Sequence, residues 1–360
     1  MKTAAFITVH VGFNFGSKLQ AIATFEVLKK IGLNPICVNY IPPRVTHRRY
    51  WKTAIKSPIK FIWRVIYYPI LLITERNFDG YLAKYCKMSV PIYAEDNFIS
   101  KCPKTDAYVS GSDQLWNCKH NEGIDTHYFF DGIKGEKIAF ASSIGMTSLP
   151  EEYARYMKKQ LKGYKAISVR EVSAVGLLEN MGIESTHVQD PTFMLDKNEW
   201  IKFASNRLVK ENYLFVYLPY NIKDKDLIYQ TVREIAQNKN LTIVSYSDNI
   251  IKDKYADKTI YFVTPGDILS LIMNAEMVVT NSFHGTAFSI NLNKQFWTYM
   301  PSKFSTRITS LLDLCGLNGR LLENKISDAQ IDDIINYNQI NSVLQQERQK
   351  AYHFLTKALH

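Results

Sequence analysis

The residues best placed to do chemistry follow apolar, strand-like runs, at the point where small and polar side chains take over. His284 stands within Asn281–Gly285, after the apolar run 277–280 and at the expected start of a helix. A helix N-terminus attracts anions, and an imidazole there can hold or transfer a proton. A lone histidine is more often structural, but this strand-to-helix junction favours an acidic or anion-binding role.

Two further positions, in the first half of the chain, offer groups that bind anions. Arg170 follows the expected strand 166–169 and precedes an expected helix, and a guanidinium at such a place suits bidentate recognition of phosphate or carboxylate. The loop Gly12–Ser17 follows the first expected strand and leads into a helix N-terminus, which can receive an anion. It is neither a dinucleotide fingerprint nor a Walker loop, so a simple turn is the alternative.

The loop Gly111–Asn117 combines side chains that are typical of sugar sites. After the expected strand 107–110 it presents an acid, two amides and an indole, namely Asp113, Gln114, Asn117 and Trp116. Convergent polar groups beside an aromatic face favour a sugar-binding loop. The alternative is structural: an aspartate that caps a helix and a tryptophan that packs in the core.

Strand-like and helix-like segments alternate along the chain, which is typical of doubly wound parallel sheets. The first half opens with strand 3–11 and helix 17–30, and a second start begins with strand 213–218. Asp190 and Pro191 interrupt the alternation between the halves. The pattern therefore predicts two successive α/β domains, with ligands bound beyond the carboxyl ends of their strands.

Length and composition agree with two folded domains. The 360 residues suit two cores, which we place at 1–195 and 196–360, the latter with C-terminal helices. The 46% hydrophobic and 22% charged content excludes disordered, collagen-like and coiled-coil classes. The five cysteines form no Cys-x-x-Cys pair, no acid or histidine cluster has metal-ligand spacing, and no signal peptide is recognisable. We therefore expect a cytoplasmic protein without a metal.

The net charge of +10 is concentrated in one segment. Between Val27 and Thr74 there is no Asp or Glu, whereas Lys and Arg occur nine times and nearly equal the whole excess. No recognisable nucleic-acid-binding module accompanies this charge. We therefore expect no nucleic-acid partner.

We interpret residues 42–85 as a basic amphipathic insertion in the first domain. A lysine or arginine recurs every four residues from Lys52 to Arg64, isoleucines and tryptophans accompany them, and Pro58 interrupts the helical pattern. Cations on one face and Trp or Ile on the other are what an interfacial helix requires, so we predict peripheral binding to an anionic membrane surface. The uncharged run 65–74 is too short to span a bilayer. The alternative is a surface helix that packs on its own domain.

Five motifs occur in the order seen in the polysaccharide pyruvyl transferase family, which the chain resembles from about Thr3 to Leu322. They are Asn14–Ala21, Gly111–Asn117, Ile167–Glu171 with Ser173, Asp190–Phe193 and Asn281–Gly285. The resemblance implies an α/β, GT-B-like fold of two Rossmann-like domains that face an interdomain cleft. It also implies that the pyruvyl group of phosphoenolpyruvate moves to a sugar as a cyclic ketal, with release of phosphate and without a sugar nucleotide.

The resemblance also implies roles for residues on the donor side. It implies that Arg170, His284 and Lys303 bind phosphoenolpyruvate, with Arg307 close by. Many family members have an arginine where this chain has Ser282, which is also assigned to donor binding; either Lys303 or Arg307 compensates there, or the phosphate is held more weakly. Ketal formation from an enol phosphate needs an acid and an anion clamp, and His284 is the candidate acid.

The first domain would hold the acceptor. Asp113 is the candidate base for a sugar hydroxyl, and the predicted acceptor-binding residues are Asn14, Gly16, Asp113, Gln114, Trp116 and Asn117. We expect a sugar of a surface polysaccharide or its polyprenyl-diphosphate-linked precursor, met at the inner face of the plasma membrane, and no cofactor beyond phosphoenolpyruvate as donor substrate. Two alternatives stay open, a GT-B nucleotide-sugar glycosyltransferase and a non-catalytic glycan- or membrane-binding scaffold.

Overall fold

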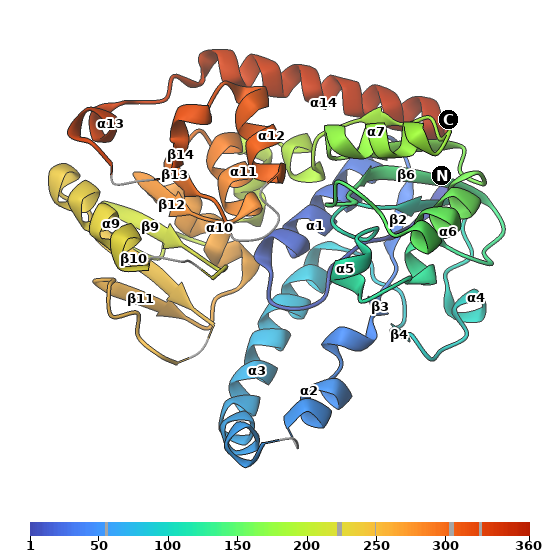
Figure 1. Ribbon diagram of the computed structural model, residues 1–360, viewed down its shortest axis with the longest axis horizontal. Helices are drawn as coiled ribbons and strands as arrows, with labels where there is room; N and C mark the ends of the chain where they lie inside the picture. The colour runs from blue at the N-terminus through green and yellow to red at the C-terminus, as the bar shows by residue number, and fades with distance from the viewer. Residues whose placement is uncertain (55–56, 222–224, 249, 302–305, 324–325) are drawn as a thin grey trace. The chain divides into compact units, whose positions relative to one another are not determined.

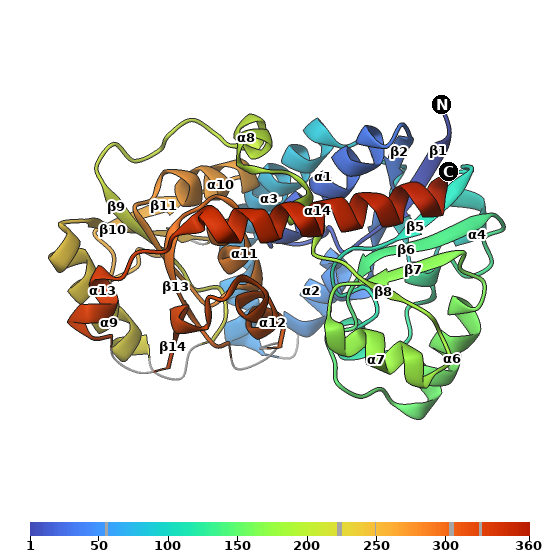
Figure 2. The ribbon, with the colours of Figure 1, turned by 90° about the horizontal axis from the view of Figure 1, so that it is seen from above.

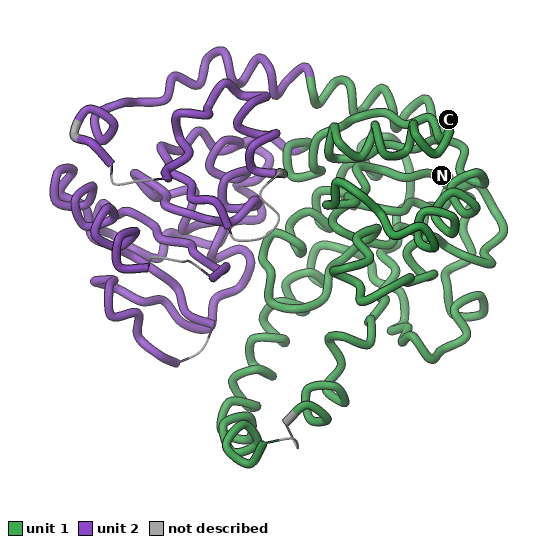
Figure 3. Tube along the Cα trace, in the orientation of Figure 1, with its two compact units in different colours: residues 1–194, 347–360 green, residues 195–346 purple. Residues whose placement is uncertain are grey.

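The computed structural model describes residues 1–54, 57–221, 225–248, 250–301, 306–323 and 326–360 (Figure 1). The chain divides into two compact units (Figure 3). Unit 1 contains Met1–Met194 and Glu347–His360, and unit 2 contains Leu195–Gln346. Each unit has a six-stranded parallel sheet, so the expectation of two Rossmann-like α/β domains is confirmed.

In the sheet of unit 1, the chain adds strands first on one side of its first strand and then on the other side. In spatial order its strands are β2 (Asn34–Cys37), β1 (Thr3–Ile7), β5 (Ala107–Ser110), β6 (Glu136–Ser142), β7 (Ala166–Val169) and β8 (Thr186–His187), and all neighbours are parallel. The chain forms β2 on one side of β1 and the later strands on the other. The carboxyl ends of β1 and β5 therefore flank the topological switch point, where doubly wound sheets bind ligands.

The first helix of unit 1 is held at both ends by features that the sequence carries. Besides α2 and α3, the helices are α1 (Phe15–Lys30), α4 (Phe98–Lys101), α5 (Cys118–Asn121), α6 (Glu151–Leu161) and α7 (Val172–Asn180). α1 begins after Asn14, whose side chain accepts hydrogen bonds from the backbone nitrogens of Gly16 at 2.9 Å and Ser17 at 3.4 Å. Lys29 and Lys30 occupy its last turn, where the helix dipole favours cations.

The basic insertion forms two helices. It lies between the short parallel strands β3 (Tyr40–Ile41) and β4 (Ile92–Tyr93), and it consists of α2 (His47–Ala54) and α3 (Pro58–Tyr85). Pro58 does not interrupt a helix as expected but begins α3, where its missing N–H removes no helical hydrogen bond. Within the described part of the chain, no helix combines the length and the apolar content needed to cross a membrane.

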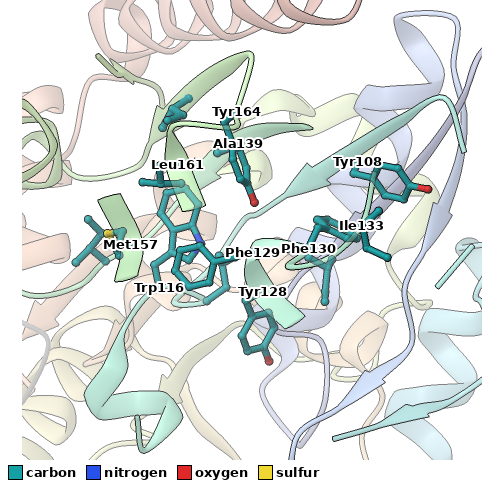
Figure 4. Packing of buried hydrophobic residues seen from close by; sticks show 14 of the residues in the cluster. Tyr108, Trp116, Tyr128, Phe129, Phe130, Ile133, Ala139, Met157, Leu161 and Tyr164 are labelled. Atoms are coloured by element: carbon teal, nitrogen blue, oxygen red, sulfur yellow. The ribbon is translucent and has the colours of Figure 1, made fainter. Parts of the chain in front are cut away.

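The core of unit 1 is rich in aromatic side chains, as Figure 4 shows. Trp116 is completely buried, and its ring stacks on Phe129 with centroids 5.6 Å apart and planes inclined by 11°. The Trp116 carbonyl accepts a hydrogen bond from the Tyr153 hydroxyl at 3.0 Å. The loop that follows β5 is therefore anchored in the core.

Unit 2 repeats the same architecture. In spatial order its strands are β11 (Lys258–Tyr261), β10 (Thr242–Ser247), β9 (Tyr213–Tyr217), β12 (Met277–Thr280), β13 (Gln295–Tyr299) and β14 (Leu321–Leu322), and all neighbours are parallel. Its helices include α8 (Lys197–Trp200), α9 (Lys225–Lys239), α10 (Pro265–Asn274), α11 (Phe283–Asn291), α12 (Thr306–Cys315) and α13 (Asp328–Asp332). Its strand order reverses between β9 and β12, so this unit has its own switch point.

The last helix, α14 (Tyr337–Leu359), belongs to both units, because residues up to Gln346 group with unit 2 and the rest group with unit 1. Lys2 Nζ donates a hydrogen bond to the Leu359 carbonyl at 2.8 Å, which joins the two ends of the chain (Figure 2). The structure thus differs from the predicted domain 196–360 in its final residues. A helical pattern reveals an apolar face but not the domain on which that face packs.

Two leucines of α14 provide a test of this division. Leu344 and Leu355 are both fully buried, and each change to alanine should cost about 2–5 kcal/mol. We expect Leu355→Ala to speed hydrogen exchange in β1 and β2 and Leu344→Ala to speed it in β12 and β13, as measured by mass spectrometry. The same exchange pattern in both variants would contradict the division.

Candidate active site

Several predicted site residues lie at the switch points of the two sheets. In unit 1 the segments after β1 and β5 carry Asn14 and Asp113, and in unit 2 the segment after β12 carries Ser282 and His284. The carboxyl ends of parallel strands meet at one edge of a sheet. Each unit therefore brings its own candidates together.

Arg170, directly after β7, is buried among three carboxylates of its own unit, with a side chain that is 2% exposed. Its Nη1 donates to Asp190 Oδ2, Nη2 lies 3.6 Å from Asp113 Oδ1, and Nε lies 3.8 Å from Glu171 Oε1. Burial acts to lower the pKa of Arg170, but the three carboxylates outweigh burial and leave this pKa above its ordinary value. The guanidinium is therefore a permanent positive charge that holds three acidic side chains.

Asp113 links the segments after β1 and β5. Its Oδ2 accepts a hydrogen bond from the Ser17 hydroxyl at 2.8 Å, and its Oδ1 accepts one from the Gln114 backbone nitrogen at 2.8 Å. Its φ of 70° lies in the left-handed region, which aspartate tolerates better than most residues. Both carboxylate oxygens thus accept hydrogen bonds within the unit. To act as a base, Asp113 would have to replace one of these hydrogen bonds with one from the acceptor hydroxyl.

Glu171 and Asp190 complete the Arg170 cluster, which we define as Arg170, Asp113, Glu171 and Asp190. Glu171 accepts a hydrogen bond from the Ser143 hydroxyl. Asp190 Oδ1 accepts one from the backbone nitrogen of Thr192 at 2.9 Å. The cluster therefore joins the segments that follow β5, β6, β7 and β8. Donor binding by Arg170 stays a prediction, and the contacts observed for its guanidinium are with carboxylates of the protein.

The other predicted acceptor residues shape the loops that carry them. Asn14 caps α1, and Gly16 lies buried in the first turn of that helix. Asn117 Nδ2 donates to Gln114 Oε1 at 2.9 Å, and Asn117 also caps α5. Trp116 is enclosed in the core (Figure 4), and its ring faces are covered by protein. This matches the alternative interpretation of the loop, in which the tryptophan packs in the core.

Two residues after β1 were missed as candidates from the sequence. His10 is buried, with Nδ1 3.2 Å from the Thr8 carbonyl and Nε2 3.2 Å from Asn39 Oδ1. Burial, helped by the charge of Lys18, lowers the pKa of His10 to about 4. Lys18 is buried too and pairs with Asp79 of α3, and burial lowers its pKa. His10 follows β1 and Lys18 lies in the first turns of α1, so both lie where the first strand leads into the first helix, which was the available signal.

In unit 2, Ser282 and His284 form the start of α11. Ser282 caps this helix by accepting a hydrogen bond from the Gly285 backbone nitrogen at 3.3 Å, and the buried His284 lies in the first turn. A Cβ atom at Gly285 would lie 2.3 Å from Thr280 Oγ1, so only glycine lets the helix approach β12 this closely. His284 is thus held at a helix N-terminus beyond a strand end, where the free N–H groups favour an anion.

Arg307, a predicted donor-side cation, lies beside Phe283, the residue before His284 in α11. Its buried guanidinium lies 5.3 Å from the centre of the Phe283 ring, and that ring lies 5.2 Å from the His284 ring. Asn281 bonds the neighbouring loop after β9, because its Nδ2 donates to the Tyr220 carbonyl at 2.9 Å. Lys303 lies outside the described residues.

Two pockets of unit 2 lie away from these residues. One of about 480 Å³ is lined by Cys315, Arg320 and Asp333 among others, and one of about 390 Å³ is lined by Arg233 and Tyr255 among others. Neither is lined by a predicted site residue. In the part of the chain that the structure describes, no three His, Cys, Asp or Glu side chains are grouped to hold a metal ion.

Comparison with solved structures shows that the fold of this chain is of the GT-B type. The protein MnaA from S. aureus, solved with UDP, is 12% identical with a TM-score of 0.50, and the alignment covers 99% of this chain and 91% of that one. A UDP-N-acetylglucosamine 2-epimerase from Rickettsia bellii is 10% identical with a TM-score of 0.50, covering 100% of this chain and 99% of that one. These likenesses concern the fold alone.

The sequence identifies the family more closely. The family model described as polysaccharide pyruvyl transferase matches residues 14–302, so the chain belongs to this family. No curated protein matches the sequence significantly.

Removing the central charge of the Arg170 cluster should destabilise unit 1. Arg170→Ala leaves buried carboxylates without their cation, which should cost about 3–5 kcal/mol in the free energy of unfolding, as measured by urea denaturation. Arg155→Ala, at an exposed arginine of α6, is the control and should change stability little. Wild-type stability in Arg170→Ala would show that the cluster does not hold these segments.

His10 should make the folded state sensitive to acid. The fold keeps His10 neutral down to pH about 4, whereas the unfolded chain binds a proton below about 6.5, so its contribution is complete above pH 6.5 and is lost as the pH falls towards 4. This loss should reach about 3 kcal/mol in urea titrations at several pH values. His10→Gln should flatten the dependence, while the exposed His353→Gln should keep it; an unchanged slope in His10→Gln would refute the assignment.

Proposed function

We propose that the protein transfers the pyruvyl group of phosphoenolpyruvate to a sugar as a cyclic ketal and releases phosphate. The family match supports pyruvyl transfer in general. The observation that carries the donor assignment is in unit 2, where the first turn of α11 places His284 beside Phe283 and the Arg307 cation lies over the same ring. A helix N-terminus, an imidazole and a guanidinium suit a substrate with phosphate and carboxylate groups.

The chemistry gives each of these groups a task. A proton added to the methylene carbon of phosphoenolpyruvate makes the neighbouring carbon electrophilic, one sugar hydroxyl adds to that carbon, and a second hydroxyl then displaces phosphate. We assign His284 to the protonation or to the departing phosphate, and Arg307, with Lys303 on sequence grounds, to the anionic charge. No further cofactor is needed, because the enol phosphate carries its own leaving group.

We propose that unit 1 receives the acceptor. The support is the position of Asp113 at the switch point of the sheet, within hydrogen-bonding distance of Ser17 from the start of α1. The contacts of Arg170 with Asp113 and two further carboxylates favour a positioning role for this arginine. The proposed acceptor is a sugar of a surface polysaccharide or its polyprenyl-diphosphate-linked precursor at the cytoplasmic face of the membrane.

Product analysis separates this proposal from its alternatives. The protein is incubated with phosphoenolpyruvate and a sugar acceptor, and phosphate release is measured together with the mass of the acceptor. A parallel incubation with UDP-sugars measures nucleotide release. Phosphate release with a ketal on the acceptor supports the proposal, nucleotide release would support a glycosyltransferase, and glycan binding without either product would support a scaffold.

His284→Ala should leave the fold intact but lower turnover by about 10²- to 10⁴-fold, the usual range for a lost general acid. The assay is phosphate release from phosphoenolpyruvate in the presence of the acceptor. His353→Ala, at an exposed position of α14, is the matched control and should keep wild-type turnover. Near-wild-type turnover in folded His284→Ala would remove His284 from the mechanism.

A further inference from the structure

The α2–α3 hairpin presents an apolar stripe that the described residues of unit 1 leave exposed. The buried residues of α3 are Thr74, Phe78 and Leu82, which all lie in its C-terminal half. Phe78 packs against Phe13, with ring centroids 6.2 Å apart, and so anchors this half on the body of the unit. The N-terminal half of α3 and α2 project from that body (Figure 1), and Arg49 of α2 pairs with Glu122 of the body.

Contacts between the two helices occupy one side of α3. Trp51 of α2 lies 4.9 Å from the Tyr68 ring and 5.9 Å from the Phe61 ring. The Arg64 guanidinium lies 4.5 Å from the Tyr50 ring. Trp51 and Arg64 therefore stabilise the hairpin itself, whereas the sequence pattern had placed them on the membrane-binding faces.

The side of α3 that faces away from α2 carries five exposed apolar residues, and Phe61, Val65 and Leu72 are exposed elsewhere on the helix. At about 100° per residue, the members of this stripe fall within an arc of about 100°. They are Ile59, Ile62, Trp63, Ile66 and Ile73, and each is 46–70% exposed. A continuous apolar stripe of this kind marks a surface that binds something.

The charge around the stripe indicates what it binds. Lys52 in the last turn of α2 and Lys60 in the first turn of α3 are exposed at the tip of the hairpin. No Asp or Glu occurs between Val27 and Thr74. Two copies meeting through this tip would bring like charges together, whereas anionic lipid headgroups would neutralise them.

We propose that the apolar stripe of α3 inserts into the interfacial region of an anionic lipid bilayer, with Lys52 and Lys60 at the headgroups. Isoleucine and tryptophan side chains supply the apolar contact area, and lysine stems reach from it to the phosphates. This surface is distinct from the residues assigned to catalysis. Vesicle binding is measured without phosphoenolpyruvate or a sugar, so its result does not depend on whether the protein catalyses pyruvyl transfer.

Trp63 reports directly on insertion. Trp116, Trp200 and Trp297 are fully buried, whereas Trp63 is 54% exposed. Phosphatidylcholine vesicles that contain phosphatidylglycerol should therefore shift the tryptophan emission of the full chain to shorter wavelength and carry the protein down in sedimentation. Trp63→Phe should still sediment but lose most of the shift. Absence of binding to these vesicles at low salt would overturn the proposal.

Substitutions on the stripe give the second test. Ile62→Ser, Trp63→Ser and Ile66→Ser together should weaken partitioning by about tenfold or more, because apolar area no longer leaves water. The matched control changes three exposed apolar residues outside the hairpin to serine, Val90, Ile201 and Ile334, and should bind as wild type. Ile62→Gln with Ile66→Gln replaces the triple variant if its circular dichroism spectrum changes. Equal binding by the stripe and control variants would overturn the proposal.

Two further measurements test the lipid assignment. Lys52→Gln with Lys60→Gln should weaken binding to anionic vesicles and reduce its dependence on salt, whereas Lys158→Gln with Lys159→Gln on α6 should not. Sedimentation equilibrium of the wild type tests self-association. A dimer that the triple serine variant abolishes, together with no vesicle binding, would assign the stripe to a second copy and overturn the lipid proposal.

Discussion

A buried arginine surrounded by three carboxylates is the constraint on which unit 1 depends. A charge that leaves water must be matched by partners, and Arg170 has Asp113, Glu171 and Asp190. Asp113 bonds Ser17 and Glu171 bonds Ser143 in turn, so the segments after four neighbouring strands are joined around one guanidinium. The position of Asp113 at the switch point follows from this network and from its bond to Ser17.

In unit 2, other contacts position the candidate residues. Asn281 bonds the loop after β9, Ser282 caps α11, and the lack of a side chain at Gly285 lets that helix approach β12. The cation on this side, Arg307, lies over an aromatic ring.

The hairpin between β3 and β4 is an addition to the doubly wound pattern. Its aromatic contacts stabilise the two helices against each other, and the C-terminal half of α3 joins it to the body of unit 1. Packing of α3 on one neighbouring helix covers only one side of it. The other side remains apolar and exposed, and the cations at the tip make an anionic surface its natural partner.

The sequence by itself determined the features that local patterns encode. Alternating strand and helix patterns predicted both Rossmann-like units, polar runs after strands located the loops at their switch points, and the charge distribution located the insertion. Tertiary structure decided the partners of individual side chains. The sequence did not show that Asp113 and Asp190 lie beside Arg170, or that Phe129 stacks on Trp116. The end of α14 and the free side of α3 were decided in the same way, because periodicity depends on near neighbours, whereas burial depends on residues distant in the sequence.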